Sequence, residues 1–279
     1  MKSSVSVAAV QMEVKWLDPD ANARAMADWI ARAATEGPVD LVVFPELAST
    51  GYVTTRDPEF MRRYYGAAEP IPGPTTRILG EAARQHGVHV VVGLLQAHPT
   101  IPATMYNTAV LIRPDGEVGA VYHKTHIPAE EKHYFYSGSE LAVLDTPLGR
   151  LGILICADNS FPEAARLLAL RGAEILVIPY ALRRWSNPDL YVGIAATRAY
   201  ENQMFVVSCN RVGQDGDIVF QGRSAIAAPS GDILARSHGE EETILRAALE
   251  AEALIRARLH QSRFRDRRPD LYRGLGDPA

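Results

Sequence analysis

The stretch RLGILICADNSFPE, residues 150–163, joins an apolar run to a polar turn. The run LGILI has the length of a buried β-strand. Ser160 and Glu163 have the spacing of a helix capping box, and Pro162 suits the first turn of a helix. The stretch therefore predicts a strand that delivers Cys156 to a helix beginning immediately after it.

A cysteine at such a strand-to-helix junction has two possible roles. The first turn of a helix presents unpaired N–H groups and a partial positive charge, which favour a thiolate over a thiol. A free cysteine at a strand end is otherwise often a buried structural residue. Cys156 is thus a candidate nucleophile, and the local sequence alone leaves both roles open.

The size and composition of the chain are those of a globular α/β protein. The chain has 279 residues, 47% of them hydrophobic, which is enough to bury a large core. No shift in composition marks a boundary, so we expect a single domain over 1–279. The formal net charge of −4 provides no general attraction for nucleic acid or an anionic membrane and is more compatible with small or neutral partners.

The two cysteines bear on the expected compartment. Cys156 and Cys209 lie far apart in the sequence, and no secretory pattern opens the chain. No apolar run approaches the roughly 20 residues that a membrane span needs. We therefore expect a cytoplasmic protein with free thiols, in which Cys209 is a core strand residue.

Helical and strand-like patterns alternate along the chain. Helices are predicted at 20–35, 74–86, 161–171, 189–201 and about 250–260, and buried strands at 5–10, 40–46, 89–94, 174–179 and 204–209. Proline-glycine turns predict antiparallel hairpins within 106–123 and 141–155, and short strands follow at 217–248. This repeated β-α-β pattern with hairpins predicts an α/β fold with a mixed sheet.

Three reactive side chains lie beside predicted strand ends, where the crevices of α/β sheets usually form. Glu46 follows one strand, Lys124 follows a hairpin, and Cys156 lies at the junction described above. A carboxylate can deprotonate a thiol, and an ammonium group can stabilise an oxyanion. This reasoning permits a catalytic triad, although each residue alone could equally be solvated or structural.

The segments that contain these residues resemble motifs of the nitrilase, or carbon–nitrogen hydrolase, superfamily. They are FPEL at 44–47, HKTHIP at 123–128 and CADNSFPE at 156–163, in the order of the family. The segment EKHYF at 131–135 is similar to the additional glutamate segment of the family. FRDRRPDLY at 264–272 resembles a tail that is common in its amidase branches.

The resemblance implies a role for each residue. Glu46 is expected to be the general base, Lys124 the electrostatic stabiliser and Cys156 the nucleophile. Glu131 is expected to position Lys124 or the substrate. The backbone N–H of Ala157 is expected to complete an oxyanion hole with Lys124. The reaction passes through a thioester, and the resemblance implies no metal and no cofactor.

The substrate pocket is expected to involve residues beyond this set, namely Tyr52, Tyr180, Ala181 and Trp185. The last three follow a predicted strand end. Two arginines at 183–184 could meet an acidic substrate, but such residues are more often solvated at the surface.

The resemblance also implies a four-layer αββα sandwich with two mixed sheets, and a homodimer or larger homo-oligomer. Within the helix predicted at 161–171, the segment 163–170 is rich in small and apolar residues, which suits either a subunit interface or internal packing. The basic, aromatic tail at 261–279 is expected to pack on a partner subunit or on its own sheet. Nucleic-acid binding by the tail is disfavoured because Asp266 and Asp270 interrupt the basic run.

Two departures from the family pattern bear on the reaction. True nitrilases tend to carry tryptophan and then glutamate after the cysteine, where this chain has Ala157 and Asp158. Carboxylate-binding carbamoylases often carry an arginine there, which is absent here. We therefore expect an amidase acting on a small aliphatic amide or N-carbamoyl amine, with release of ammonia or amine. The alternatives are nitrile hydrolysis, a non-catalytic binding protein, and a metal hydrolase using His123 and His126.

Overall fold

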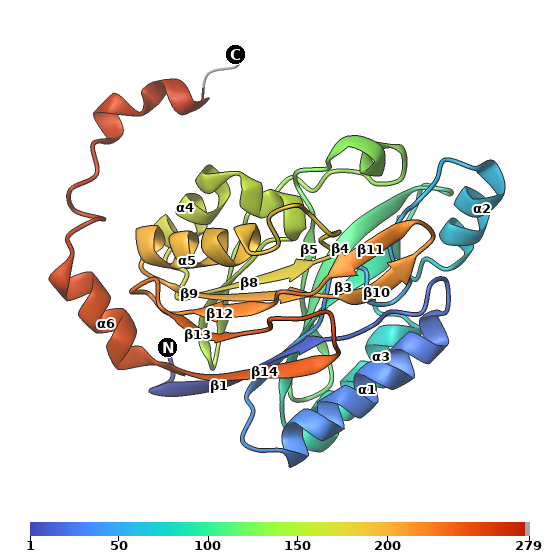
Figure 1. The fold of residues 1–279 in the computed structure, drawn as a ribbon, viewed down its shortest axis with the longest axis horizontal. Coiled ribbons are helices and arrows are strands. Elements are labelled where there is room, and N and C mark those ends of the chain that lie inside the picture. Colours follow the sequence, from blue (N-terminus) through green and yellow to red (C-terminus); the bar gives the residue numbers. More distant parts are fainter. Residues whose placement is uncertain (277–279) are drawn as a thin grey trace.

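The computed structural model describes residues 1–276. Two six-stranded sheets lie face to face between outer layers of helices (Figure 1). This is the expected four-layer αββα sandwich.

The first sheet is mixed, because β1 (Ser4–Gln11) pairs in parallel with β2 (Leu41–Val43) and β2 with β3 (His89–Ala97), while the other pairs are antiparallel. Helices α1 (Pro19–Thr35) and α3 (Pro74–His86) cover its outer face (Figure 1). The strands lie in the order β14 (Thr243–Glu250), β1 (Ser4–Gln11), β2 (Leu41–Val43), β3 (His89–Ala97), β4 (Met105–Ile112) and β5 (Val118–His123).

The second sheet is also mixed, with parallel pairing of β7 with β8 and of β8 with β9. Helices α4 (Pro162–Leu170) and α5 (Leu190–Asn202) form its outer layer (Figure 1). The strands lie in the order β13 (Ile233–Arg236), β12 (Ala225–Ala227), β9 (Phe205–Asn210), β8 (Ile175–Tyr180), β7 (Gly149–Ile153) and β6 (Val143–Thr146).

The inner faces of the two sheets share one apolar core, and Cys209 shows how tightly they pack. This residue of β9 is fully buried, and its Sγ lies 3.2 Å from the carbonyl oxygens of Val10 and Val43 in the opposite sheet. Burial raises the pKa of its thiol. The prediction that Cys209 is a core strand residue is confirmed.

The strand-to-helix junction after β7 differs from the prediction. Cys156–Ser160 form a 3₁₀ turn, and α4 begins only at Pro162. The capping box predicted from Ser160 and Glu163 is wrong, because the residue before the helix is Phe161 and no side chain caps the helix. The reason is Asp158, whose carboxylate accepts the N–H of Ile155 at 2.9 Å and closes the turn before the helix starts.

Several short elements were not predicted. Helix α2 (Pro58–Gly66) is capped by Asp57, whose Oδ2 accepts the N–H of Phe60 at 2.8 Å. The Asp-Pro pair was a usable signal for its start. The polar loop after β5 contains a 3₁₀ turn, η1 (Ala129–His133). Strand β10 (Val212–Asp215) was also not predicted, and it forms a separate antiparallel ribbon with β11 (Ile218–Gln221), which corresponds to the first of the short strands predicted at 217–248.

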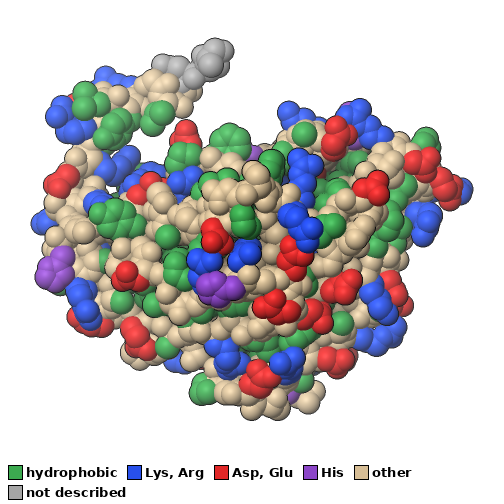
Figure 2. Space-filling model, in the orientation of Figure 1, with side chains coloured by type: hydrophobic (Ala, Val, Ile, Leu, Met, Phe, Trp, Pro, Cys, Tyr) green, Lys and Arg blue, Asp and Glu red, His purple; other side chains and the backbone are tan. Residues whose placement is uncertain are grey.

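The C-terminal segment leaves the sandwich after helix α6 (Ala251–His260), as Figures 1 and 2 show. Phe264 still packs on the body, beneath the guanidinium groups of Arg166 and Arg258. The following turns, η3 (Pro269–Leu271) and η4 (Arg273–Gly276), contain no buried residue. Over the described residues, the end of the tail therefore does not pack on its own sheet.

Two surface properties bear on possible partners. None of the helices within 1–276 is both long enough and apolar enough for a membrane crossing. On the face shown in Figure 2, basic and acidic side chains are interspersed over the sandwich.

Candidate active site

The candidate catalytic residues lie where strands of both sheets end. Glu46 follows β2, Lys124 follows β5, and Cys156 follows β7. The sheets are joined at this point because the N–H of Glu46 donates to the carbonyl of Tyr180, the last residue of β8. The fold thus brings together side chains that are far apart in the sequence.

Lys124 is the centre of a buried ionic cluster. Its Nζ lies 2.7 Å from Oε1 of Glu46 and 2.7 Å from Oε2 of Glu131. The side chains of Lys124 and Glu46 are fully buried. Burial opposes the charged ammonium, but Glu131 and Glu46 outweigh it and hold the pKa of Lys124 well above its usual value. Lys124 is therefore a permanent cation held between two carboxylates.

Two further donors orient the Glu46 carboxylate. Asn107 Nδ2 donates to Oε1 at 2.7 Å, and the backbone N–H of Ala181 donates to Oε2 at 2.8 Å. Asn107 lies in β4 and was missed by the sequence reasoning. An amide in the otherwise apolar strand MYNTAVLI was the available signal, since a buried polar side chain needs a partner.

Tyr52 holds the other carboxylate of the cluster. Its hydroxyl donates to Glu131 Oε1 at 2.5 Å. Burial raises the pKa of Tyr52 well above its usual value, and Glu131 adds to this effect, so the hydroxyl remains protonated and able to donate. Tyr52 was expected to contact substrate, and the structure also gives it a supporting role towards Glu131.

Cys156 occupies an unusual backbone conformation at the start of its 3₁₀ turn. Its φ of +45° is in the left-handed region, which non-glycine residues rarely adopt. Its side chain reaches the cavity but is only 9% exposed. The turn therefore places a largely buried sulfur at the cavity wall.

The surroundings of Cys156 favour the thiol over the thiolate. Burial raises the pKa of the Cys156 thiol well above its usual value, the charge of Glu46 raises it further, and Lys124 only partly opposes this. A short 3₁₀ turn provides less stabilisation of the anion than the predicted α-helix. The raised pKa therefore favours the protonated thiol of Cys156.

This protonation state can be measured. We expect no thiolate absorbance from Cys156 between about pH 6 and pH 9, although an ordinary cysteine titrates near 8.5. The measurement is the ultraviolet absorbance of the thiolate as a function of pH, compared between the wild type and Cys156→Ser. Both proteins contain Cys209, so its contribution cancels in the difference. A thiolate step near neutral pH, lost in the variant, would contradict the assignment.

Asp158 connects the loop that carries Lys124 to the loop that carries Cys156. Its carboxylate accepts hydrogen bonds from the Tyr122 hydroxyl at 2.7 Å and from the backbone N–H of His126 at 2.8 Å. Burial acts to raise its pKa, but hydrogen bonds from His126, Ile155 and Tyr122 outweigh this and lower it. Asp158, which departs from the nitrilase pattern, is therefore also a structural link between the two loops.

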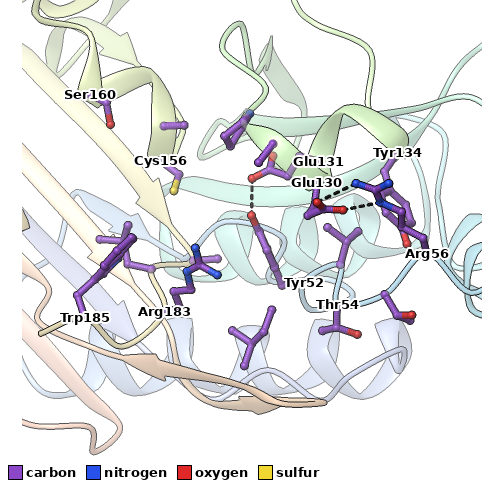
Figure 3. A pocket seen from close by; sticks show the side chains of 18 of the residues that line it. Tyr52, Thr54, Arg56, Glu130, Glu131, Tyr134, Cys156, Ser160, Arg183 and Trp185 are labelled. Atoms are coloured by element: carbon purple, nitrogen blue, oxygen red, sulfur yellow. Dashed lines mark hydrogen bonds and ion pairs between the residues drawn. The ribbon is translucent and has the colours of Figure 1, made fainter.

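A cavity of about 530 Å³ opens above Cys156 (Figure 3). Tyr52, Ala157, Ala181 and Trp185 line it, as expected from the sequence. Much of the remaining wall is apolar or aromatic, with contributions from Val53, Tyr134, Leu182, Tyr191 and Ile218. The cavity suits a small molecule with limited polarity near the reacting group.

Tyr180, which was expected in the substrate pocket, lies outside the cavity wall. It is 1% exposed and is not part of the cavity wall. Its hydroxyl accepts a hydrogen bond from Asn159 Nδ2 at 2.6 Å, and its ring packs against Tyr191. Tyr180 therefore supports the site from behind, because it belongs to the buried end of β8 and not to the loop that follows.

The two histidines considered for a metal site belong to different packing arrangements. His123 stacks on Tyr106 with centroids 4.1 Å apart, and its Nε2 lies 2.8 Å from Gln96 Oε1. His126 stacks on Phe161. Within 1–276, no three His, Cys, Asp or Glu side chains form a group that could hold a metal ion.

A cysteine at a cavity, in a sandwich fold with a buried carboxylate and ammonium group at the same strand ends, is an arrangement suited to hydrolysis through a thiol nucleophile. The family model described as carbon–nitrogen hydrolase matches residues 6–259. The chain therefore belongs to the carbon–nitrogen hydrolase family.

Relatives with several activities match the chain over most of its length. The nitrilase of Pyrococcus abyssi is 34% identical over 278 residues, covering 96% of this chain and 99% of the relative. Human omega-amidase NIT2 is 30% identical over 280 residues, covering 97% of each. The N-carbamoylputrescine amidase of Solanum lycopersicum is 32% identical over 297 residues, covering 97% of this chain and 94% of the relative.

A solved structure of an amidase from Nesterenkonia sp. AN1 superposes with a TM-score of 0.80 at 29% identity, covering 98% of each chain. That structure shows the acetamide moiety of fluoroacetamide covalently added to the active-site cysteine. A cysteine nucleophile is thus observed in a neighbour with the same fold.

Proposed function

We propose that this protein hydrolyses the carbon–nitrogen bond of a small amide or N-carbamoyl amine through a thioester on Cys156. The observation that carries the proposal is a cysteine facing a small cavity beside the Glu46–Lys124–Glu131 cluster. The amidase relatives and the covalent cysteine adduct in the Nesterenkonia neighbour support it.

In the acylation step, Glu46 removes the thiol proton as Cys156 Sγ attacks the carbonyl carbon. The negative charge that develops on oxygen is stabilised by Lys124 and by the backbone N–H of Ala157, whose position in the first turn leaves it without a helical partner. Glu46 then gives the proton to the departing nitrogen. The carbon–nitrogen bond breaks, and the acyl group remains on sulfur as a thioester.

In the deacylation step, Glu46 takes a proton from water, which attacks the thioester carbon. The carbon–sulfur bond breaks, the thiolate recovers the proton, and the acid product leaves. Because the pKa of the Cys156 thiol is raised, the thiol keeps its proton until a base removes it. Glu46 is this base in acylation, and it is also the base for water in deacylation. Glu131 keeps Lys124 in place and does not exchange protons with the substrate.

The test is ammonia release over a panel of matched primary amides, N-carbamoyl amines and nitriles. We expect amides or carbamoyl compounds to turn over faster than nitriles of the same carbon skeleton. Hydrolysis of nitriles alone would favour the second candidate function, which the nitrilase of P. abyssi among the relatives supports. No turnover of any compound by folded protein would favour a non-catalytic binding role.

We also propose that the chain works as one catalytic unit, in the cytoplasm. Catalytic side chains are contributed by both sheets, so neither sheet could act alone. Cys156 and Cys209 are both free thiols, which suits a reducing compartment.

We further propose a homo-oligomer formed through the α4–α5 layer and the tail. Leu167 and Leu170 of α4 are 37% and 42% exposed, although the opposite side of that helix is buried. In the tail, Leu271 and Leu275 are 67% and 70% exposed. A second subunit would remove these apolar side chains from water.

The oligomer makes a prediction about mass in solution. We expect the wild type to have at least twice the mass of one chain by light scattering, and Leu167→Asp with Leu275→Asp to have a lower mass. The control is Leu234→Asp, because Leu234 is 44% exposed and belongs to the edge strand β13, not to α4, α5 or the tail. A monomeric wild type, or no effect of the paired substitutions, would reject the interface.

A further inference from the structure

A buried arginine of α5 contacts the turn that carries Cys156. Arg198 is 8% exposed, and its Nη2 donates to the backbone carbonyl of Asn159 at 3.0 Å. Both residues lie outside the cavity wall. We propose that Arg198 and Tyr180 are positioning residues that fix this turn, and with it the nucleophile, relative to Glu46. The inference rests on the proposed hydrolysis through Cys156 and adds the residues that place its sulfur.

The sequence of the turn explains why it uses a side chain from another helix. In a 3₁₀ turn a carbonyl accepts the N–H three residues ahead, as the carbonyl of Asp158 does from Phe161 at 3.2 Å. The next bond of this pattern would join the Asn159 carbonyl to residue 162, but Pro162 has no N–H. A buried carbonyl without a donor is destabilising. The guanidinium of Arg198 provides that donor.

The backbone conformation of Cys156 also depends on contacts around the turn. Its φ of +45° is one that a non-glycine residue keeps only when the surrounding structure fixes it. The Asp158 carboxylate binds the N–H of Ile155 and holds the start of the turn, while Arg198 holds its end. We therefore expect loss of the Arg198 contact to relax the backbone and displace the sulfur.

Tyr180 connects this turn to the proposed base. Its hydroxyl accepts a hydrogen bond from Asn159 Nδ2 at 2.6 Å. Its backbone carbonyl accepts the N–H of Glu46 at 3.2 Å, and the N–H of the next residue, Ala181, donates to Glu46 Oε2 at 2.8 Å. Tyr180 and Asn159 are 1% and 0% exposed, so water does not compete for their contact. The end of β8 therefore holds both the turn of the nucleophile and the carboxylate of the base.

Arg198 is itself held in place within α5. Its Nη1 donates to Oε1 of Glu201, three residues further along the helix, at 3.0 Å. A charged donor binds a carbonyl more strongly than a neutral donor does, and low exposure to water limits screening of this bond. The carbonyl of Asn159 is therefore fixed to α5 by a donor that cannot readily turn away.

Arg198→Met tests the inference, because methionine keeps much of the apolar volume and removes the donors. We expect kcat for amide hydrolysis to fall by about tenfold to a hundredfold, since small displacements of a reacting group have effects of this size. KM should change little, because Arg198 lies outside the cavity wall. Arg198→Lys should lose less kcat, since its ammonium group can still donate to the Asn159 carbonyl.

Arg246→Met is the matched control. Arg246 also donates to a backbone carbonyl, that of Ala33 at 2.9 Å, but it belongs to β14 at the edge of the first sheet. Its replacement should leave kcat unchanged. An unchanged kcat in Arg198→Met would overturn the inference, as would an equal loss in Arg246→Met or a rise in KM at constant kcat.

Alkylation of Cys156 by iodoacetamide separates this inference from the proposed function, because it requires loss of the thiol proton but no amide turnover. Intact mass measures its rate, with Cys156→Ser as the blank. We expect Arg198→Met to slow it by at least about tenfold, because a displaced thiol of raised pKa loses its base. If no amide turns over, the proposed hydrolysis fails and the alkylation rates still test the inference. Equal rates in the wild type and Arg198→Met would overturn it.

Tyr180→Phe is the second variant and decides the matter if Arg198→Met does not fold. It removes one oxygen, the acceptor of the Asn159 amide, and keeps the buried ring. We expect lower kcat and slower alkylation with little change in KM. Wild-type values of both rates in folded Tyr180→Phe would overturn the inference.

Discussion

Replacing Cys156 with alanine is expected to abolish amide hydrolysis, with kcat falling by roughly 10³-fold or more, because no other group can form the acyl intermediate. The fold should survive, since the side chain is small and lies at the cavity wall. The measurements are ammonia release and the thermal unfolding midpoint. Intact mass should show an acyl adduct on the wild type with a slowly released amide, and no adduct on the variant.

Cys209→Ala is the matched control for this experiment. Cys209 is the other cysteine and is fully buried between the sheets, away from the cavity. Its loss should cost some stability and leave the mass adduct in place. Full activity of Cys156→Ala would contradict the assignment of Cys156 as the nucleophile and would therefore rule out the thioester mechanism.

The second large effect is expected at Asp215, which lies outside the family motifs. Asp215 and Arg211 form a fully buried ion pair, and Asp215 Oδ2 accepts the N–H of Tyr52 at 2.7 Å. The Arg211 guanidinium lies 4.0 Å from the Phe220 ring centroid, and Tyr52 packs on the same ring. This cluster holds both the backbone and the ring of Tyr52, which in turn holds Glu131.

Asp215→Ala should reduce the free energy of unfolding by about 3–5 kcal/mol, because it leaves the Arg211 charge buried without a partner. It should also lower kcat, because Tyr52 and then Glu131 lose their support. Guanidinium denaturation and ammonia release measure the two effects. Combining Arg211→Met with Asp215→Leu should restore much of the stability, since apolar side chains can replace a buried pair, while the lost Tyr52 contact still lowers kcat.

Asp145→Ala provides the comparison. Asp145 pairs with Arg150 at 3.2 Å, but its side chain is 86% exposed, so its removal should change stability little. A loss at Asp215 no larger than the loss at Asp145 would show that the buried pair does not support the site.

Much of the fold follows from local pattern. The helix predicted at 74–86 has the same bounds as α3, because Pro74 suits its first turn and Gly87, in the left-handed conformation, ends it. Helix α2 was missed although Asp57 and Pro58 mark its start, because it is short. Asn107 was missed for a different reason. Its partner Glu46 is 61 residues away, and no local pattern connects the two.

The sequence by itself determined the alternation of strands and helices and the candidates for the reactive side chains, because spacing, turn residues and motif order are local properties. The tertiary structure decided the burial of Cys156, the position of Tyr180 behind the cavity, and the binding of Lys124 between Glu46 and Glu131. Each of these depends on burial and on charges from segments distant in the chain. The strength of an electrostatic interaction is set by distance and by exclusion of water, and both arise only when the sheets pack together.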